Sequence, residues 1–128
     1  MENAMEQAAR RGNPSFVWRA GQARRLEMVR RYAPLEAQRV LDVGCGVGMY
    51  TSAFQKSTPH VFGIEVEFAR AAEAQDRSPN VAQSVGETLP FASDSFDVVF
   101  SHEVLEHVTD DRRCAQEMVR VTRPGGHL

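Results

Sequence analysis

The hydrophobic positions of this chain fall into short runs, separated by segments with helical spacing. Apolar runs at residues 39–43, 60–66 and 96–101 are bounded by polar turn residues, so each predicts a strand. The last of these (FDVVFS) is apolar enough to be buried on both faces of a sheet. Residues 80–85 predict a weaker strand, the third in chain order.

Helical spacing fills the segments before and between these strands. Helices are expected at residues 15–32 and 49–56, in a segment that contains Phe68 and is ended by Ser78-Pro79, and in a last segment ended by Pro124-Gly125-Gly126. The residues that share an apolar face are Trp18, Leu26, Val29 and Ala33 in the first helix, Phe68, Ala71, Ala72 and Gln75 in the third, and Cys114, Met118 and Val121 in the last.

Alternating strands and helices imply parallel pairing with right-handed crossovers. The predicted class is α/β, a doubly wound parallel sheet of about four strands with an N-terminal helix. Residues 15–128 are expected to form one domain. Residues 1–14 contain Gly12-Asn13-Pro14 and are expected to be a loose arm.

Composition and charge narrow the classes of partner. The chain has 42% hydrophobic residues, 25% charged residues and a net charge of -2, which gives no reason to expect nucleic acid or an anionic membrane. The arginines before the first strand are interpreted as the solvated face of a helix, because no base-reading motif accompanies them. These arginines are Arg10, Arg11, Arg19, Arg24, Arg25, Arg30 and Arg31.

The cysteines and the hydropathy of the chain bear on its compartment. Cys45 and Cys114 are the only cysteines and lack the CxxC spacing of metal sites. They fit reduced thiols better than a disulfide framework. The first residues lack the apolar run of a signal peptide, and no segment reaches transmembrane length. We therefore expect a cytoplasmic protein.

Three glycines at alternate positions, Gly44, Gly46 and Gly48, follow the first strand. They allow the backbone to approach a ligand and to turn into a helix whose N–H groups can meet an anion. A dinucleotide fingerprint is G-x-G-x-x-G, and its last small position is occupied here by Met49. A P-loop is excluded because no Gly-Lys-Ser or Gly-Lys-Thr follows.

The run VLDVGCGVGMYT resembles motif I of the class I S-adenosylmethionine-dependent methyltransferases. The stretches GIEVEFA, GETLPFASDSFDVVFSHEVLEHV and VTRPGGHL resemble later segments of the small-molecule branch of that family, in the same order. Together they cover about residues 39–128. The resemblance implies the Rossmann-like methyltransferase fold and S-adenosylmethionine as cofactor.

The resemblance also implies what the chain leaves out. The family fold is a seven-stranded sheet with an antiparallel last strand, and this chain supplies four strands and stops as the fifth begins. In the family order the fourth strand lies between the first and the fifth. FDVVFS is therefore expected at a sheet edge, where self-association is a hazard.

Site residues follow by the same resemblance. Asp42 is expected to orient the methionine portion of the cofactor, beside the backbone of the glycine loop, and Glu65 to bind both ribose hydroxyls. The full cofactor-binding set is Asp42, Gly44, Cys45, Gly46, Gly48, Glu65, Val66, Gly86, Glu87 and Ser101. Asp42 as a tether for loop N–H groups, and Glu65 as a solvated strand end, remain alternatives.

Recognition of adenine departs from the family pattern. Relatives often carry Asp-Ala before the Glu-x-Leu-Pro-Phe stretch, where this chain has Val85-Gly86. The backbone at Gly86 can still meet the ring edge, with Ser84 or Glu87 as a substitute acceptor. The Leu89-Pro90-Phe91 turn lies near adenine by analogy, and a plain packing role for Phe91 is the alternative.

The histidines after the fourth strand raise a catalytic and a metal hypothesis. His102 is a candidate substrate contact or proton acceptor, with a capping or surface role as the alternative. On a helix, His102 and Glu106, and Glu103 and His107, are paired at i, i+4. The zinc-binding motif H-E-x-x-H needs a second histidine where this chain has Glu106, so no metal site is predicted. Phe16 and Trp18 either cover the cofactor or pack the first helix.

The resemblance implies methyl transfer to a small-molecule acceptor, with this chain supplying the cofactor-binding half. A positive sulfur already activates the methyl group, so positioning and exclusion of water can supply much of the catalysis. Two other functions remain open. One is a noncatalytic or partner-dependent nucleotide-binding subunit, and the other is an NAD-dependent oxidoreductase, which Met49 disfavours.

Overall fold

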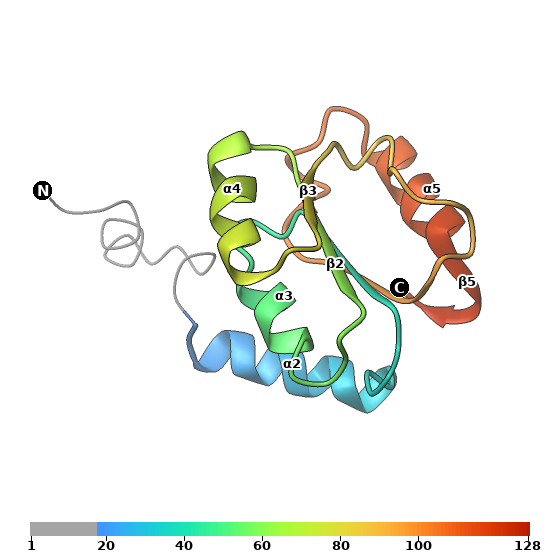
Figure 1. The fold of residues 1–128 in the computed structure, drawn as a ribbon. Helices are drawn as coiled ribbons and strands as arrows, with labels where there is room; N and C mark the ends of the chain where they lie inside the picture. The colour runs from blue at the N-terminus through green and yellow to red at the C-terminus, as the bar shows by residue number, and fades with distance from the viewer. Residues whose placement is uncertain (1–17) are drawn as a thin grey trace, which may run out of the picture.

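The computed structural model describes residues 18–128. Its elements are α2 (Ala20–Tyr32), β1 (Val40–Val43), α3 (Met49–Phe54), β2 (Val61–Glu65), α4 (Phe68–Arg77), β3 (Val81–Gln83), β4 (Phe96–Ser101), α5 (Asp111–Val121) and β5 (Thr122–His127) (Figure 1). All four predicted strands are confirmed. The predicted arm at 1–14, and Phe16, lie outside the described residues.

The strands form one parallel sheet in the order β3-β2-β1-β4-β5, which confirms the α/β class. One expectation is wrong: a fifth strand is present, so β4 lies inside the sheet and not at its edge. Residues TRPGGH follow α5 directly and pair with β4, with a register shift between Phe96 and Val98. The Pro-Gly-Gly sequence ends a helix, but a proline is also tolerated on an edge strand, where one side of the backbone has no partner.

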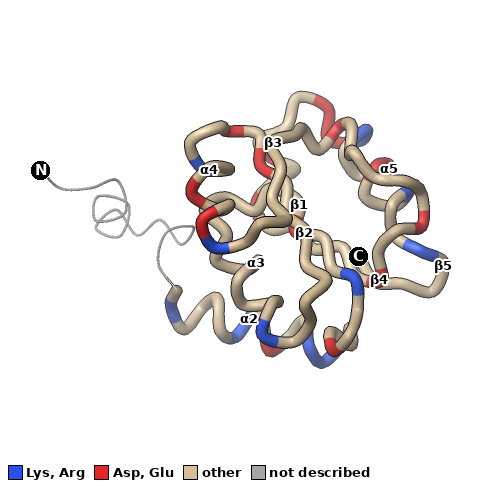
Figure 2. Tube along the Cα trace, viewed as in Figure 1, with Lys and Arg blue, Asp and Glu red and all other residues tan. Residues whose placement is uncertain are grey.

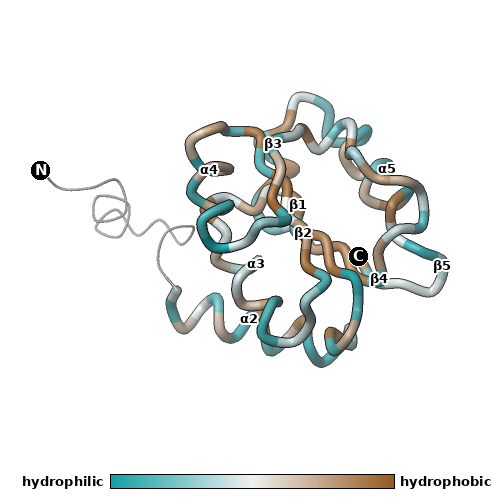
Figure 3. The backbone as a smooth tube through the Cα atoms, viewed as in Figure 1, coloured by the Kyte–Doolittle hydropathy of each residue, from teal (hydrophilic) through white to brown (hydrophobic). Residues whose placement is uncertain are grey.

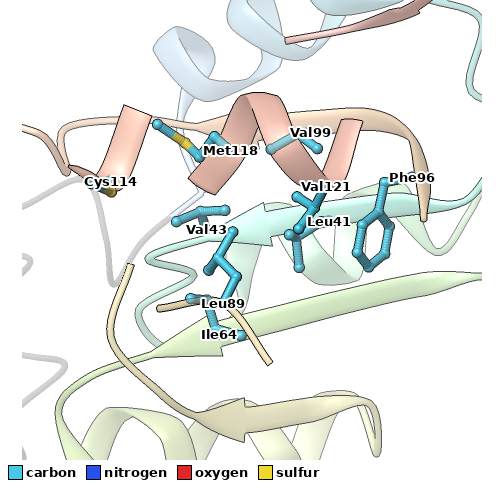
Figure 4. Packing of buried hydrophobic residues seen from close by; sticks show 9 residues of the cluster. All are labelled: Leu41, Val43, Ile64, Leu89, Phe96, Val99, Cys114, Met118 and Val121. Carbon is cyan, nitrogen blue, oxygen red and sulfur yellow. The ribbon is translucent and has the colours of Figure 1, made fainter. Parts of the chain in front are cut away.

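α5 covers one face of the sheet and forms the larger core cluster (Figure 4). Its residues Cys114, Met118 and Val121 pack on Leu41 and Val43 of β1, among others. The predicted apolar face of this helix is therefore confirmed. Fully burying a side chain of this size contributes about 1.5–3 kcal/mol.

α2 and α3 cover the opposite face. Leu26 of α2 and Phe54 of α3 pack against Val40, Val61 and Val98, and hydrophobic colour follows the central strands between the helices (Figure 3). The outer side of α2 carries exposed arginines (Figure 2). This agrees with the predicted solvated face for Arg24, Arg30 and Arg31, whereas Arg25 is half-buried and donates to the Tyr50 hydroxyl oxygen.

Two expectations about helices are wrong in detail. Trp18 precedes α2, so it does not share the helix face. Phe68 of α4 is 73% exposed, because the helix packs through its small residues Ala71 and Ala74. Ala74 lies so close to Gly48 that a Cβ there would sit 3.2 Å from the Ala74 Cβ. α4 therefore approaches the glycine loop through alanines, and Phe68 is left at the surface.

The segment after β4 is not helical. Glu103 has a φ of 56°, which breaks any helix beginning at His102, and α5 starts only at Asp111. The Asp110 carboxylate caps α5 by accepting from the Arg113 N–H at 2.9 Å. The i, i+4 pairing considered for residues 102–107 on a helix therefore does not occur. Within residues 18–128, no helix has the length and hydropathy needed to cross a membrane.

Candidate functional site

A cavity of about 530 Å³ opens at the carboxyl ends of the parallel strands. This is the edge at which α/β sheets bind ligands. Most of the predicted site residues line it: Asp42, Gly44, Cys45, Gly46, Glu65, Val66, Gly86, Glu87 and His102. Gly48 and Ser101 do not. The structure thus brings the residues of the predicted site together in one cavity, except for Gly48 and Ser101.

The three loop glycines have different surroundings. All three have positive φ, but a Cβ on Gly44 would lie 2.4 Å from Val104 Cγ2, and one on Gly48 would press on Ala74. A Cβ on Gly46 would meet no described atom within 4 Å. Gly44 and Gly48 therefore serve the packing of the loop, whereas Gly46 presents bare backbone to the cavity.

Asp42 is a buried acid at the wall of this cavity. It is 3% exposed, and Thr51 Oγ1 of α3 donates to its Oδ2 at 2.8 Å. Burial raises the pKa of Asp42 to about 7, and the negative charge of Glu65 acts in the same direction. The hydrogen bond from Thr51 has the opposite effect and lowers the pKa. The carboxyl group is thus anchored to α3 and poised to change charge near neutral pH.

Glu65 is the second buried acid, 7% exposed, at the end of β2. The alternative of a solvated strand end does not agree with this burial. The ion pairs between described residues include neither Asp42 nor Glu65. Two neighbouring carboxyl groups therefore line a cavity whose wall also includes Arg70, without belonging to the ion pairs given above. Buried carboxyl groups of this kind favour a ligand with positive charge or hydroxyl groups.

Cys45 lines the cavity and helps to anchor the glycine loop through its backbone N–H. Its N–H and that of Gly44 both donate to the Ile64 carbonyl, at 2.8 and 2.9 Å, which ties the loop to β2. Burial, with the charges of Asp42 and Glu65, raises the pKa of the Cys45 thiol. The thiol is therefore not a nucleophile at neutral pH.

An apolar, exposed part of the cavity follows β2 and β3. Val66 is 58% exposed and Val85 is 43% exposed, and both line the cavity. Gly86 also lines it, but a Cβ there would lie 2.6 Å from Cys114 Sγ, so this glycine is needed for packing on α5. The Ser84 hydroxyl lies within hydrogen-bonding distance of two backbone carbonyls, those of Val85 and Thr88.

The turn from Leu89 to Phe91 does not line the cavity. Leu89 is buried in the core cluster with α5, and Phe91 packs edge-on against Phe62 and Phe96. This geometry agrees with the packing alternative. Glu117 of α5 holds the turn, because its carboxylate accepts from the Leu89 N–H at 2.8 Å.

His102 lies in the cavity wall beside other aromatic rings. Its ring stacks on Phe100 at an interplanar angle of 18° and meets Tyr50 edge-on. Burial, followed by the positive charge of Arg25, lowers the pKa of His102. The imidazole is therefore mostly neutral at pH 7 and able to accept a proton. Residues 18–128 contain no group of three or more His, Cys, Asp or Glu side chains that could hold a metal.

Sequence reasoning missed several residues that line the cavity. Gln22 comes from α2 and is buried, Tyr50 comes from α3, and Arg70 comes from α4. Gln22 and Arg70 belong to no recognisable motif. For Tyr50 one signal was present, because a residue in the first turn after the glycine loop faces the same cavity as the loop.

Comparison with known proteins agrees with this geometry. Residues 41–128 match a family described as "Methyltransferase domain". An uncharacterized methyltransferase of Mycolicibacterium vanbaalenii is 43% identical over 91 residues, covering 68% of this chain and 36% of its own length. A ubiquinone biosynthesis O-methyltransferase of Ralstonia nicotianae is 33% identical over 111 residues, covering 81% of this chain and 47% of its own.

A solved structure matches almost the whole chain. CalS10 with bound S-adenosylmethionine, described as an amino pentose methyltransferase from Micromonospora echinaspora, superposes with a TM-score of 0.75 at 29% identity. The match covers 98% of this chain and 55% of that one. The chain thus spans about half the length of this protein, and less of the two sequence relatives. It belongs to the class I S-adenosylmethionine-dependent methyltransferases.

Proposed function

We propose that this chain binds S-adenosylmethionine in the cavity and supplies the cofactor-binding half of a methyltransferase for a small-molecule acceptor. One observation carries the proposal: Asp42 and Glu65 are buried side by side in a cavity wall, without an ion pair among the described residues. Buried carboxyl groups are costly unless something binds them. An ammonium group and a pair of ribose hydroxyls are suitable partners.

The other lining residues fit the same ligand. Gly46 has open space where a side chain would be, so a ligand can approach the loop backbone. Val66 and Val85 offer apolar surface for a planar base, and Gly86 and Glu87 lie beside them. For Gly48 and Ser101 we propose indirect roles: Gly48 seats the loop on α4, and Ser101 pairs in register with Val43 at the end of β1.

When bound, S-adenosylmethionine supplies a methyl group on a positively charged sulfur. The chain's own residues then hold the reactants in line and exclude water. Asp42 carries a charge that a bound cation stabilises, and neutral His102 accepts a proton from the acceptor. No further acid or base is required.

The comparisons support a small acceptor. Two of the matched proteins are described as an O-methyltransferase of ubiquinone biosynthesis and as an amino pentose methyltransferase. We propose no nucleic-acid or membrane partner, and a cytoplasmic location; the two cysteines are free and buried. NAD is disfavoured because Met49 lines the cavity where a dinucleotide loop needs a small residue.

Calorimetric titration tests this proposal. S-adenosylmethionine and S-adenosylhomocysteine are expected to bind the chain, and NAD is not. Glu65→Gln is expected to weaken binding about tenfold to a hundredfold, because a charge-assisted pair of hydrogen bonds is lost. Glu36→Gln, at an exposed position outside the cavity lining, is the matched control. Binding of NAD without either sulfur compound would overturn the proposal.

A further inference from the structure

Three aromatic side chains line the part of the cavity beside β4. The rings of Tyr50 and Phe100 have centroids 4.9 Å apart, and both lie near His102, at 5.9 and 6.4 Å. Trp18 extends the group beyond the cavity lining, with its ring edge-on to Tyr50 at 5.3 Å. We call Tyr50, Phe100 and His102 the aromatic wall.

The aromatic wall and Glu65 lie on different sides of the central strand β1, which itself carries Asp42. β1 separates β4, which carries Phe100, from β2, which carries Glu65. The cavity therefore has an acidic part over β1 and β2, an apolar part that continues over β3, and an aromatic part over β4. If the acidic part holds the cofactor, as proposed above, the aromatic part is left for the acceptor.

Polar groups hold the aromatic wall in place. Arg25 of α2 donates from Nη1 to the Tyr50 hydroxyl oxygen at 2.8 Å, which fixes the ring against the wall. Gln22, one helical turn earlier, is 3% exposed and reaches the same cavity. α2 precedes the segment that matches the family, so its contacts with the cavity lie outside the family match.

We propose that the aromatic wall binds a planar acceptor, an aromatic ring bearing a hydroxyl group, and that His102 is its proton acceptor. The proposal rests on the proposed function and names the acceptor class for the same cavity. Aromatic rings favour stacked or edge-to-face neighbours over saturated rings of similar size. The rings of Tyr50 and Phe100 lie 4.9 Å apart, a distance typical of aromatic pairs. A planar acceptor ring can pack against them in the same way.

The methyl transfer then balances without another reactant. The acceptor oxygen forms a bond to the methyl carbon while the carbon–sulfur bond breaks, leaving its electron pair on sulfur. The phenolic proton passes to an imidazole nitrogen of His102 and from there to solvent. The charged groups that act on His102 are Arg25 from α2 and Glu103 and Glu106 from its own loop. Arg25 favours the neutral ring, and the two glutamates oppose it.

The test uses binding, so it does not depend on turnover. Trp18 is the chain's single tryptophan and touches Tyr50, so its fluorescence reports on the aromatic wall. The chain is titrated with catechol and with trans-cyclohexane-1,2-diol, both with and without saturating S-adenosylhomocysteine. Catechol is expected to bind at least about tenfold more tightly, which corresponds to about 1.4 kcal/mol.

Variants assign the preference to the aromatic wall. Tyr50→Leu and Phe100→Leu are each expected to remove most of the preference for catechol, whereas Phe62→Leu is expected to keep it. Phe62 is a matched control, since it is a half-buried phenylalanine of the same sheet that packs on Phe91 and Phe96 outside the cavity. In NMR spectra, catechol is expected to shift the His102 imidazole, identified by its absence in His102→Gln.

Equal binding of catechol and the saturated diol overturns the inference, as does a preference that survives both leucine variants. Failure of the proposed function looks different. S-adenosylhomocysteine then fails to bind, whereas the preference for catechol is still measured on the free chain. Binding of the homocysteine compound with no ring preference leaves the proposed function standing and removes the acceptor class.

Discussion

Asp42 is a buried carboxyl group whose pKa lies near neutrality. In the folded state it holds a proton that the unfolded chain releases above about pH 4. Its contribution to stability therefore falls as pH rises from about 4 toward 7, and is level above that. A positively charged ligand reverses the effect, because it stabilises the carboxylate.

Asp42→Asn separates these two effects. At about pH 8 the variant is expected to be more stable by about 2–4 kcal/mol, because the cost of the buried charge disappears, and to match the wild type below about pH 4. Denaturant unfolding at both pH values measures this. A variant that is less stable at pH 8 would contradict the assignment of a desolvated charge.

The raised pKa of Asp42 also predicts that ligand binding releases a proton. Near pH 7, S-adenosylhomocysteine is expected to displace a fraction of one proton from the wild type, because its ammonium group favours the charged form of Asp42. Calorimetry in two buffers with different ionisation enthalpies measures the release. Asp42→Asn is expected to release none, and an unchanged release would assign the proton to another group.

Gly46 and Gly48 form a matched pair in one loop. Both have positive φ, so alanine at either costs about 1–2 kcal/mol of backbone strain. Gly48→Ala also presses on Ala74, whereas Gly46→Ala has open space in front of it. We expect Gly48→Ala to lose more stability, and Gly46→Ala to lose more affinity for S-adenosylhomocysteine. Unfolding and calorimetric titration of both variants check the order, and the reverse order would contradict it.

At the scale of elements, α5 holds the turn that follows β3. Glu117 of α5 is buried, and its carboxylate accepts hydrogen bonds from Arg120 Nε and from the Leu89 N–H, each at 2.8 Å. Arg120 also donates to the carbonyl of Phe91 at 2.9 Å. The hydrogen bond from Arg120, followed by the one from the Leu89 N–H, lowers the pKa of Glu117 to about 2. One buried carboxylate thus links a helix to the turn behind the cavity.

Glu117→Gln is expected to destabilise the fold by about 2 kcal/mol at pH 7, since hydrogen bonds to a charged group are replaced by neutral ones. The folded pKa is lowered, so the stabilisation is present above about 4.5 and is lost as pH falls toward about 2. The difference between wild type and variant in thermal unfolding should shrink over that range. A difference that stays constant from pH 7 to 3 would contradict this account.

At the scale of the molecule, the sequence predicted the sheet well because its inner strands are buried on both faces. Runs such as VLDV and FDVVFS leave few alternatives, and their parallel order follows from the intervening helices. The edge strand β5 was missed because TRPGGH has little apolar character and contains a proline. β5 forms by pairing with β4, and a local sequence pattern does not indicate such a tertiary contact.

The site was predicted as far as its motif extends. Asp42, Gly46 and Glu65 lie on the chain next to strand ends, so sequence places them at the cavity. Gln22 and Tyr50 reach it only through the packing of α2 and α3 on the sheet. The conformation of the turn at 102–109 could not be predicted, because a non-glycine residue, Glu103, adopts a left-handed backbone conformation there.

The central claim is that this cavity binds S-adenosylmethionine or its product. The most direct test is a titration of the chain with S-adenosylhomocysteine, followed by amide NMR. The account predicts shifts concentrated at Asp42–Gly46, Glu65–Val66 and Val85–Glu87, and little change along the outer face of α2. Saturable binding with shifts elsewhere, or no binding at all, would contradict it.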